Sequence, residues 1–450
     1  MASRTSGSSA ADTITLLQRG LASRILIELK SDTNLEQLQT ALASNVSVKH
    51  ADLFFAKSLE EKTQQECLAL IQTVSSRPNL QRVSLTSEEF SSYSLPITML
   101  SELLTLSATI TAIQLGTIAL SGTVHDFATL AESFRNQPTL KELRACCWLS
   151  EETRMNGLTL DPLVQAMATS RSLESIYFHP TFLLSSGGST EVLSSATLGM
   201  LCTCPNLRVL NIGNCNLNDD HVTAMAITTL AAQHDSVLTE LHLTTGLAER
   251  GSRALADCLR ANTTKLTALS IFNTTVDDTD GTSDDSEVDS NNGGGDDAED
   301  YHAHMARALQ VNQSLQHFVL HGRKLTMGSQ KAFVEMMRKN CTLERISLVE
   351  LEDDIQAEMD MFTRLNRCGR KRLLQQLNNE TPERRLDWID TMSLVSNELD
   401  CLFYLLSIKP SLCELPTPSG SHSAASTRVG SMKRSPGEDS YPKGKRAKTN

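Results

Sequence analysis

The sequence predicts an α/β solenoid built from stacked repeats, and three observations support this fold class. A motif of the form Leu-x-x-Leu-x-Leu, or a close aliphatic variant, recurs about every thirty residues. The stretches between the motifs carry apolar residues at helical spacing. Aromatic residues make up only 4% of the chain, so aliphatic residues must form the core. A short repeat cannot bury its apolar face alone and has to stack on its neighbours, so a fixed period predicts a solenoid.

The clearest copy of the motif lies at residues 207–217, which read Leu-Arg-Val-Leu-Asn-Ile-Gly-Asn-Cys-Asn-Leu. This segment fits Leu-x-x-Leu-x-Leu-x-x-Cys/Asn-x-Leu without a mismatch. The first aliphatic position of each copy is assigned to Val48, Leu80, Ile110, Leu140, Leu173, Leu207, Leu238, Leu266, Leu315 and Leu343. Successive copies are 28 to 34 residues apart, except for a gap of 49 residues between Leu266 and Leu315 that holds an insertion.

The segments between the motifs predict one helix in each repeat. In residues 251–262, the side chains of Ala254, Leu255, Cys258 and Leu259 share one helical face. Residues 125–136, 160–170, 305–312 and 330–340 show similar patterns. Each unit is therefore a strand, a loop, a helix and a tight turn. We expect the strands to pair in parallel, with the helices outside, so that the stack bends into a horseshoe.

The repeat pattern resembles a known family. Residues 254–271 follow Ala-Leu-x-x-x-Leu-x-x-Asn-x-x-Leu-x-x-Leu-x-Leu, with one extra residue in the turn. Long repeats with a full helix and this run resemble the ribonuclease-inhibitor-like class of leucine-rich-repeat (LRR) proteins. The resemblance covers roughly residues 25–350. It implies a leucine-rich-repeat solenoid with a binding surface and does not name the partner.

Composition and short motifs limit the function classes. The chain shows no apolar signal segment and no apolar run of about 18 residues, so we expect no membrane span. Its eleven cysteines are expected to be reduced and buried, as in a cytosolic or nuclear protein. The pairs Cys146-Cys147 and Cys202-Thr-Cys204 lack a second pair at zinc-ligand spacing, so no metal site is expected. No cofactor motif is present either.

Four Asn-x-Ser/Thr triplets resemble glycosylation acceptors. They begin at Asn45, Asn262, Asn312 and Asn340. Each falls at the turn between a helix and the next strand, where the repeat itself calls for asparagine. We therefore interpret these asparagines as part of the repeat and not as glycosylation sites.

The insertion between the eighth and ninth motifs is strongly acidic. Residues 277–300 contain eleven acidic and no basic residues, so the net charge of −12 would be −1 without them. A glycine-rich, highly charged segment is expected to be disordered. It is interpreted as a tolerated surface insertion, with an alternative in which it attracts histones or other basic proteins, or covers a basic patch of the chain itself.

The C-terminal region departs from the repeat. Residues 360–413 are predicted to form a helical cap that contains Trp388 and closes the open end of the solenoid. Within it, Thr381 and Pro382 indicate a helix start. The basic run at residues 364–372 is interpreted as a solvated face and not as a nucleic-acid site.

The last residues, 414–450, form a basic tail that is expected to be disordered. Two basic groups separated by a ten-residue spacer resemble a bipartite nuclear import signal, which an importin would read. The residues that carry it are Lys433, Arg434, Lys445, Arg446 and Lys448. Nuclear localisation is therefore expected, with cytoplasmic localisation as the alternative.

These signals divide the chain into five regions. We predict a disordered N-terminus at residues 1–12, an N-terminal cap at 13–47 and about ten leucine-rich repeats at 48–359, with the insertion at 277–300. The helical cap at 360–413 and the tail at 414–450 complete the chain. The protein is expected to be a monomer.

Four common catalytic or cofactor-binding motifs are absent from the sequence. The sequence has no Gly-x-Ser-x-Gly elbow, phosphate loop, dinucleotide fingerprint or His-Glu-x-x-His helix, so the prediction is a non-enzymatic scaffold that binds a protein. The Ran-type GTPase activators also combine this repeat class with an acidic region, and a regulator of that type is a further alternative. Their acidic region, however, follows the repeats.

The binding site is predicted on the concave face, at the positions between the aliphatic residues of each motif. These positions carry Arg82, Glu142, Arg144, Tyr177, His179, Asn211, Glu240, His242, Phe272, His317 and His321. Aromatic residues and arginine are the usual anchors of protein interfaces. The middle of this surface is the predicted partner site, with Tyr177, His179, Asn211, Glu240, His242, Phe272 and His321 as its residues.

Overall fold

The structure of the protein is a computed structural model. The structure describes residues 10–20, 22–29, 33–56, 61–87, 94–150, 153, 158–179, 194–217, 219–232, 236–245, 249–273, 301–322, 325–376, 388 and 390–409. The acidic insertion, the basic tail and the helix start predicted at Thr381 and Pro382 lie outside these residues.

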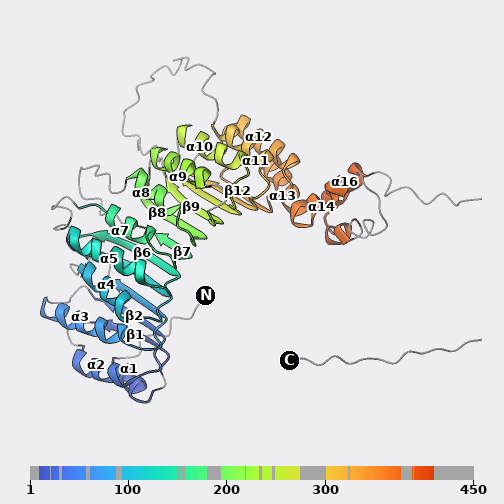
Figure 1. Ribbon diagram of the computed structural model, residues 1–450. Helices are drawn as coiled ribbons and strands as arrows, with labels where there is room; N and C mark the ends of the chain where they lie inside the picture. The colour runs from blue at the N-terminus through green and yellow to red at the C-terminus, as the bar shows by residue number, and fades with distance from the viewer. Residues whose placement is uncertain are drawn as a thin grey trace, which may run out of the picture.

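One parallel sheet of 12 strands runs through the described part of the molecule (Figure 1). The strands are β1 (Arg24–Leu29), β2 (His50–Phe55), β3 (Arg82–Ser87), β4 (Ser94–Pro96), β5 (Ala112–Ser121), β6 (Glu142–Leu149), β7 (Ser175–Phe178), β8 (Val209–Leu217), β9 (Glu240–Thr245), β10 (Ala268–Asn273), β11 (His317–His321) and β12 (Arg345–Leu348). They follow one another in chain order, except that the short strand β4 pairs with the far end of β5. The predicted parallel α/β solenoid is confirmed.

Helices connect successive strands and form a single outer layer (Figure 1). They are α1 (Ala10–Gln18), α2 (Leu35–Ser44), α3 (Glu61–Ser75), α4 (Ile97–Leu106), α5 (Val124–Asn136), α7 (Asp161–Ala168), α8 (Ser195–Leu201), α9 (Asp219–Ala232), α10 (Glu249–Arg260), α11 (Tyr301–Val311), α12 (Met327–Lys339), α13 (Asp353–Arg367), α14 (Arg370–Gln376) and α16 (Leu399–Ile408). The five helices predicted between motifs correspond to α5, α7, α10, α11 and α12. The sheet lies on the inside of the curve, so the molecule is a leucine-rich-repeat-like horseshoe.

The repeat motif works by burying its aliphatic positions between the two layers. All ten first positions, from Val48 to Leu343, are at most 2% exposed. Along β2 and β7 the burial alternates strictly, so every second side chain lies under the helices. The residues between them project from the opposite, concave side of the sheet. Apolar residues therefore recur at every second position in the strands and at helical spacing between the strands. Together they form one continuous core layer between the sheet and the helices.

The sheet begins one strand before the first motif recognised in the sequence. Residues 13–47, predicted as a cap, contain β1, which pairs with β2 over six residue pairs from Arg24↔His50 to Leu29↔Phe55. Ala22 occupies the first position of this repeat and is 8% exposed. The small side chain at that position hides the repeat from a search for leucine, although Ile25 and Ile27 are buried like their counterparts.

Buried amides at the helix-to-strand turns tie one repeat to the next. Asn45, Asn312 and Asn340 are each 2% exposed. Asn340 Nδ2 donates to the carbonyl oxygens of Leu309 and Asn312, and Gln137 Nε2 plays the same role towards Leu104 and Ser107. The last carbonyls of a helix have no partner within it, so these amides satisfy groups that would otherwise be buried without a hydrogen bond. This burial confirms that these three asparagines belong to the repeat.

The fourth triplet asparagine, Asn262, is exposed and has a different geometry. Its backbone adopts φ of 53°, a left-handed conformation that asparagine tolerates better than most residues. Its Nδ2 nevertheless donates to the carbonyl oxygen of Val311 at 2.8 Å, which ties its turn to the next repeat.

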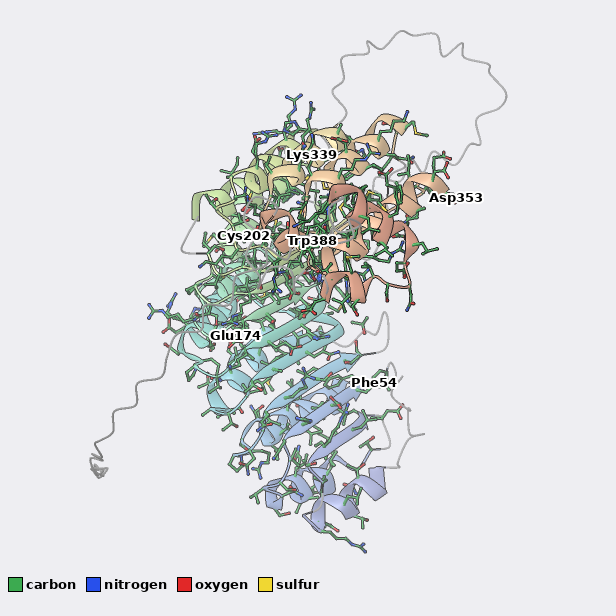
Figure 2. All side chains as sticks on the ribbon, turned by 90° about the vertical axis from the view of Figure 1, so that its right-hand side faces the viewer. Phe54, Glu174, Cys202, Lys339, Asp353 and Trp388 are labelled. Carbon is green, nitrogen blue, oxygen red and sulfur yellow. The ribbon has the colours of Figure 1, made fainter. Side chains whose placement is uncertain are left out.

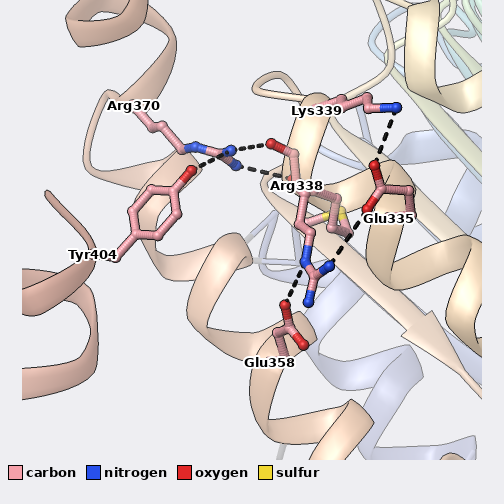
Figure 3. A network of polar contacts seen from close by, with 7 residues as sticks. Glu335, Arg338, Lys339, Glu358, Arg370 and Tyr404 are labelled. Carbon is pink, nitrogen blue, oxygen red and sulfur yellow. Dashed lines mark hydrogen bonds and ion pairs between the residues drawn. The ribbon is translucent and has the colours of Figure 1, made fainter. Parts of the chain in front are cut away.

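The C-terminal helices close the solenoid around a buried arginine (Figure 3). Arg370 is 1% exposed, and its guanidinium donates to the carbonyl oxygens of Met337 and Arg338 in the last turn of α12. The same group donates to the hydroxyl of Tyr404 on α16 at 2.9 Å and lies 4.7 Å from the ring centroid of Phe362. One cation thus caps α12 and draws α14 and α16 against it.

Helical structure at this end begins earlier than predicted, at Asp353 in α13. Trp388 is 2% exposed and lies among the C-terminal helices (Figure 2), as a residue of the predicted cap should. None of the helices that the structure describes is long and apolar enough to span a membrane.

Candidate functional site on the concave face

The parallel register arranges the concave side chains in rows that cross the strands. We define row one as the residues level with Glu240, which are Arg24, His50, Arg82, Ala112, Glu142, Ser175, Val209, Glu240, Ala268, His317 and Arg345. Row two lies two residues further along each strand and contains Leu26, Asp52, Ser84, Gln114, Arg144, Tyr177, Asn211, His242, Ser270, Val319 and Ser347.

Row three lies two residues further again, near the carboxyl ends of the strands. In its C-terminal part Thr244, Phe272 and His321 are register partners on β9, β10 and β11. His179 directly follows β7, and its backbone N–H donates to the carbonyl oxygen of Ala145. The seven residues predicted as the partner site therefore all lie on this one face, spread over the three rows.

The N-terminal half of the face holds its charges in internal pairs. Arg24 Nη2 lies 2.9 Å from Asp52 Oδ2. Arg82 Nη2 lies 3.0 Å from Glu142 Oε2 and reaches across the small side chain of Ala112 on the strand between them. Exposed ion pairs of this kind contribute little to stability, so they mainly decide which charges remain available to a partner.

Arg144 extends this charge network towards the middle of the face. Its Nε lies 2.5 Å from Glu142 Oε1, and its guanidinium carbon lies 4.4 Å from the centroid of the Tyr177 ring on the next strand. Glu142 is thus held by two arginines, one of which stacks on an aromatic ring. The sequence predicted Arg82, Glu142 and Arg144 on this face, but it did not indicate that both arginines pair with the same carboxylate.

The C-terminal half of the face carries imidazoles and a phenyl ring. The ring of His179 is hydrogen bonded through Nε2 to Asn211 Oδ1 at 2.9 Å. His321 Nε2 lies 2.8 Å from Ser347 Oγ, and its ring meets the Phe272 ring edge to face with centroids 5.4 Å apart. His242 Nε2 lies 3.7 Å from Glu240 Oε2, which is an ion pair only when the imidazole is protonated.

Gly213 provides the space in which the His179 ring lies. A Cβ atom at this position would lie 2.4 Å from Nδ1 and from Cε1 of His179. Gly213 follows Ile212, the register partner of Phe178, so the ring leans across from β7 onto β8. Any larger residue at 213 would move the imidazole away from Asn211. The glycine of the motif therefore shapes the surface at the middle of the face.

Two adjacent cysteines on β6, Cys146 and Cys147, lie on opposite sides of the sheet and differ in burial. Cys147 is buried under the helices, and burial raises the pKa of its thiol to about 12, with the neighbouring Cys146 adding to the shift. Cys146 faces the concave side and is half-buried, and burial also raises the pKa of its thiol. The nine described cysteines are free, and six of them are buried.

The concave face shows no catalytic constellation within the described part of the chain. No group of three or more histidine, cysteine or acidic side chains there could hold a metal ion. Among the described thiols, each pKa that shifts is raised, mainly by burial. A reactive thiol needs a lowered pKa instead. What the face offers chemically is hydrogen bonding, aromatic stacking and charged side chains.

Sequence reasoning missed β1, the first strand of this face, and named no concave residue on β2. Leu26 on β1 is 58% exposed at the end of row two, and Phe54 on β2 is half-buried (Figure 2). Their repeats carry alanine at one motif position, Ala22 and Ala51 respectively. The alternation of buried residues around them is the signal that could have found them.

Comparisons with known proteins add little to this description. No protein-family model and no curated protein matches the chain. Among solved structures, the chain is similar to the actin-binding site 2 of leiomodin-1, with 13% identity, a TM-score of 0.23, and coverage of 58% of this chain and 100% of that one. It is also similar to a chain of the Rad7 and Elc1 complex in yeast, with 11% identity, a TM-score of 0.23, and coverage of 59% and 77% respectively. Similarity this low carries no functional argument, and the architecture described above rests on the register of the sheet.

Proposed function

We propose that this protein is a non-enzymatic scaffold of the ribonuclease-inhibitor-like leucine-rich-repeat class, which binds a protein partner on its concave face. The observation that carries the proposal is the exposure of large side chains on the concave side of a sheet whose other side is packed under the helices. Phe272 is 42% exposed at the centre of the C-terminal half, and Tyr177 is half-buried beneath Arg144. Aromatic residues in a central position are the usual energetic anchors of protein interfaces.

The shape of the surface supports a protein partner in preference to a small molecule. Three rows of side chains extend over a curved parallel sheet, and their hydrogen-bonding groups are distributed along its length. A small-molecule site would instead gather its polar groups in one enclosed cavity. A solenoid provides this kind of extended concave surface because it grows in one dimension.

The proposal is tested by an affinity pull-down with mass spectrometry. We expect a variant with Tyr177, His179, His242 and Phe272 all replaced by alanine to lose partners that the wild-type chain retains. A matched variant of the outer surface, with the exposed residues His125, Glu132 and Arg135 on α5 replaced by alanine, should retain them. Equal partner sets in the wild type and the concave variant would contradict the proposal.

A second candidate function rests on the acidic insertion, which lies outside the described residues. Its eleven acidic residues favour an attraction for histones or other basic proteins. A deletion of residues 277–300 in the same pull-down distinguishes the two functions. Partners lost only with this deletion, and lost at high ionic strength, would assign binding to the insertion. Nuclear import through Lys433, Arg434, Lys445, Arg446 and Lys448 is likewise a proposal, tested by the localisation of a chain that lacks residues 414–450.

A further inference from the structure

We propose that the C-terminal end of the concave face, over β11 and β12, binds a carboxylate of the partner, with Arg345 as the residue that pairs with it. His317 and Ser347 flank the arginine and complete the site. The inference rests on the proposed function, because it names the chemistry of a partner at that same face. It commits to an acidic segment of a protein as the occupant, and the charge complementarity of Arg345 is its basis.

Arg345 differs from the other arginines on the concave side of the described strands. The three others, Arg24, Arg82 and Arg144, each have a side-chain nitrogen at 3.0 Å or less from a carboxylate oxygen. Arg345 is exposed, and its side chain has no hydrogen bond or ion pair with any described residue. A guanidinium carries its charge throughout the physiological pH range and has five N–H donors. The charge of Arg345 is therefore available to a partner.

The strands around Arg345 carry no acidic residue on their concave side. The three rows cross β10, β11 and β12 at Ala268, Ser270, Phe272, His317, Val319, His321, Arg345 and Ser347. Glu344 directly precedes Arg345, and the alternation of side chains along the strand turns it away from the concave side. Glu350 and the acids of α13 follow the other end of β12, which is four residues or about 13 Å long. An occupant of complementary charge is therefore acidic.

His317 and Ser347 place two further polar groups next to Arg345. His317 is its register partner on β11, one strand spacing of about 4.8 Å away, and Ser347 lies two residues further along β12, at about 7 Å. Neither group needs a charge to act, because a neutral imidazole and a hydroxyl each have one hydrogen to donate. A carboxylate has two oxygens, so it can take two parallel bonds from the guanidinium and a further bond from either neighbour.

Ser347 is already held in place by a neighbouring side chain. Its Oγ lies 2.8 Å from Nε2 of His321. In the tautomer in which Nε2 carries the proton, His321 donates to Ser347 and leaves the hydroxyl hydrogen for a ligand. Val319, level with Ser347 on β11, is half-buried and apolar. The carbon stem of an acidic residue can pack on it while the carboxylate reaches Arg345.

A carboxylate suits this site better than a phosphoryl group. One permanent cation balances the single charge of a carboxylate, whereas a phosphorylated side chain carries about −1.5 to −2 at neutral pH and is usually bound by several arginines. The planar guanidinium of Arg345 also matches the two oxygens of a carboxylate in spacing and plane.

The inference is tested with a capped peptide that carries one aspartate between serines, titrated into the full chain at physiological salt and followed by ligand-observed NMR. The peptide of the same sequence with asparagine is the matched probe. We expect the aspartate peptide to bind at least about five-fold tighter, because only its carboxylate makes charge-assisted hydrogen bonds. Arg345→Gln should remove this difference, and Ser347→Ala should weaken the aspartate peptide about three-fold.

A chemical readout locates the contact on the surface. Phenylglyoxal modifies accessible arginines, and mass spectrometry measures the modification at each position. In the free chain Arg345 should react at least about three-fold faster than Arg24, whose guanidinium donates twice to Asp52. The aspartate peptide should slow the reaction of Arg345 and leave that of Arg24 unchanged, and the asparagine peptide should slow neither.

Two matched variants make the result specific. Arg24→Gln on β1 and Arg135→Gln on α5 remove exposed arginines that are paired with a carboxylate, and neither should change the affinity by more than about two-fold. Urea denaturation of Arg345→Gln should give the wild-type midpoint, because its exposed side chain bonds to no described residue.

Three outcomes overturn the inference. The first is equal or absent binding of the two peptides to the wild-type chain, and the second is unchanged binding of the aspartate peptide to Arg345→Gln. The third is binding that appears only when the eleven acids of residues 277–300 are replaced by their amides, since the insertion of the chain itself then occupies the site. None of these decides the proposed function, because the concave variant of the pull-down retains Arg345, His317 and Ser347.

Discussion

The helix-to-strand turns and the concave face both carry polar side chains, but the chain uses them in opposite ways. At the turns, amides such as Asn340 are 2% exposed and hydrogen bonded to backbone carbonyls of the repeat before. On the concave face, half-buried Asn211 is hydrogen bonded to the side chain of His179, and half-buried His242 lies 3.7 Å from the carboxylate of Glu240. A buried polar group with a complete set of partners holds the architecture together. A half-buried group whose partner is another side chain can exchange that partner for a binding protein.

The largest expected difference between the two regions concerns stability. Asn340→Ala removes two hydrogen bonds from Asn340 Nδ2 and also leaves the backbone N–H groups of Thr342 and Leu343 without their side-chain acceptor. We expect it to lower the free energy of unfolding by about 3 kcal/mol, because the groups left behind are buried. Asn211→Ala, the control on the concave face, should cost less than about 1 kcal/mol.

Urea denaturation of both variants measures this difference, and hydrogen exchange around the turn shows whether the loss is local to the neighbouring repeats. Equal destabilisation by the two substitutions would remove the distinction between architectural and exchangeable amides.

An intermediate effect is expected for the adjacent thiols of β6. In the native protein at pH 8, Cys146 on the concave side should react with iodoacetamide at least about ten-fold faster than Cys147. The Cys147 thiol is buried, and its pKa is raised to about 12. Mass spectrometry of the labelled peptide measures the ratio. Similar labelling of both cysteines would mean that this strand opens readily.

The same burial makes stability dependent on alkaline pH. A buried thiol whose pKa is raised stays protonated in the folded state, while the unfolded chain loses the proton at a lower pH. The contribution of Cys147 is therefore complete below about pH 9 and is lost as the pH rises towards about 12. Stability measured over that range should fall, and replacing Cys147 by alanine should reduce the slope.

The smallest expected effect belongs to Gly213→Ala. The new methyl group would overlap the His179 ring, which is a side chain that can rotate away, so we expect a loss of stability below about 1 kcal/mol. Binding should respond more than stability, because the imidazole leaves Asn211 and the middle of the face changes shape. Pull-down recovery from this variant, set beside its midpoint of urea denaturation, tests the difference. A large loss of stability with unchanged recovery would show that the glycine serves packing alone.

The parts of the fold that follow from a repeated local pattern were predictable. All ten first motif positions are buried, and the helices between them lie where helical spacing indicated. The pattern failed where a repeat substitutes a small residue, as Ala22 does before β1. It also placed the start of the C-terminal helices too late, because the helical region opens on the acidic residues of α13 before its apolar residues begin.

Much less of the candidate site was predictable. The alternation of side chains along each strand places Tyr177, Glu240 and Phe272 on one face. It does not determine which side chains pair across strands. The reach of Arg82 over Ala112 to Glu142 depends on the register of three strands. The position of the His179 ring over Gly213 depends on two strands that the chain connects through some thirty intervening residues.

The sequence by itself determined the architecture of this protein, because each repeat must bury the same aliphatic positions and only stacking in register achieves this. It also determined which side chains share the concave face. Only the tertiary structure decided how those side chains compensate one another. Whether a charge is satisfied depends on what the neighbouring strand brings within a few ångströms of it, as Arg144 does for Glu142 and no permanent cation among the described residues does for Glu240.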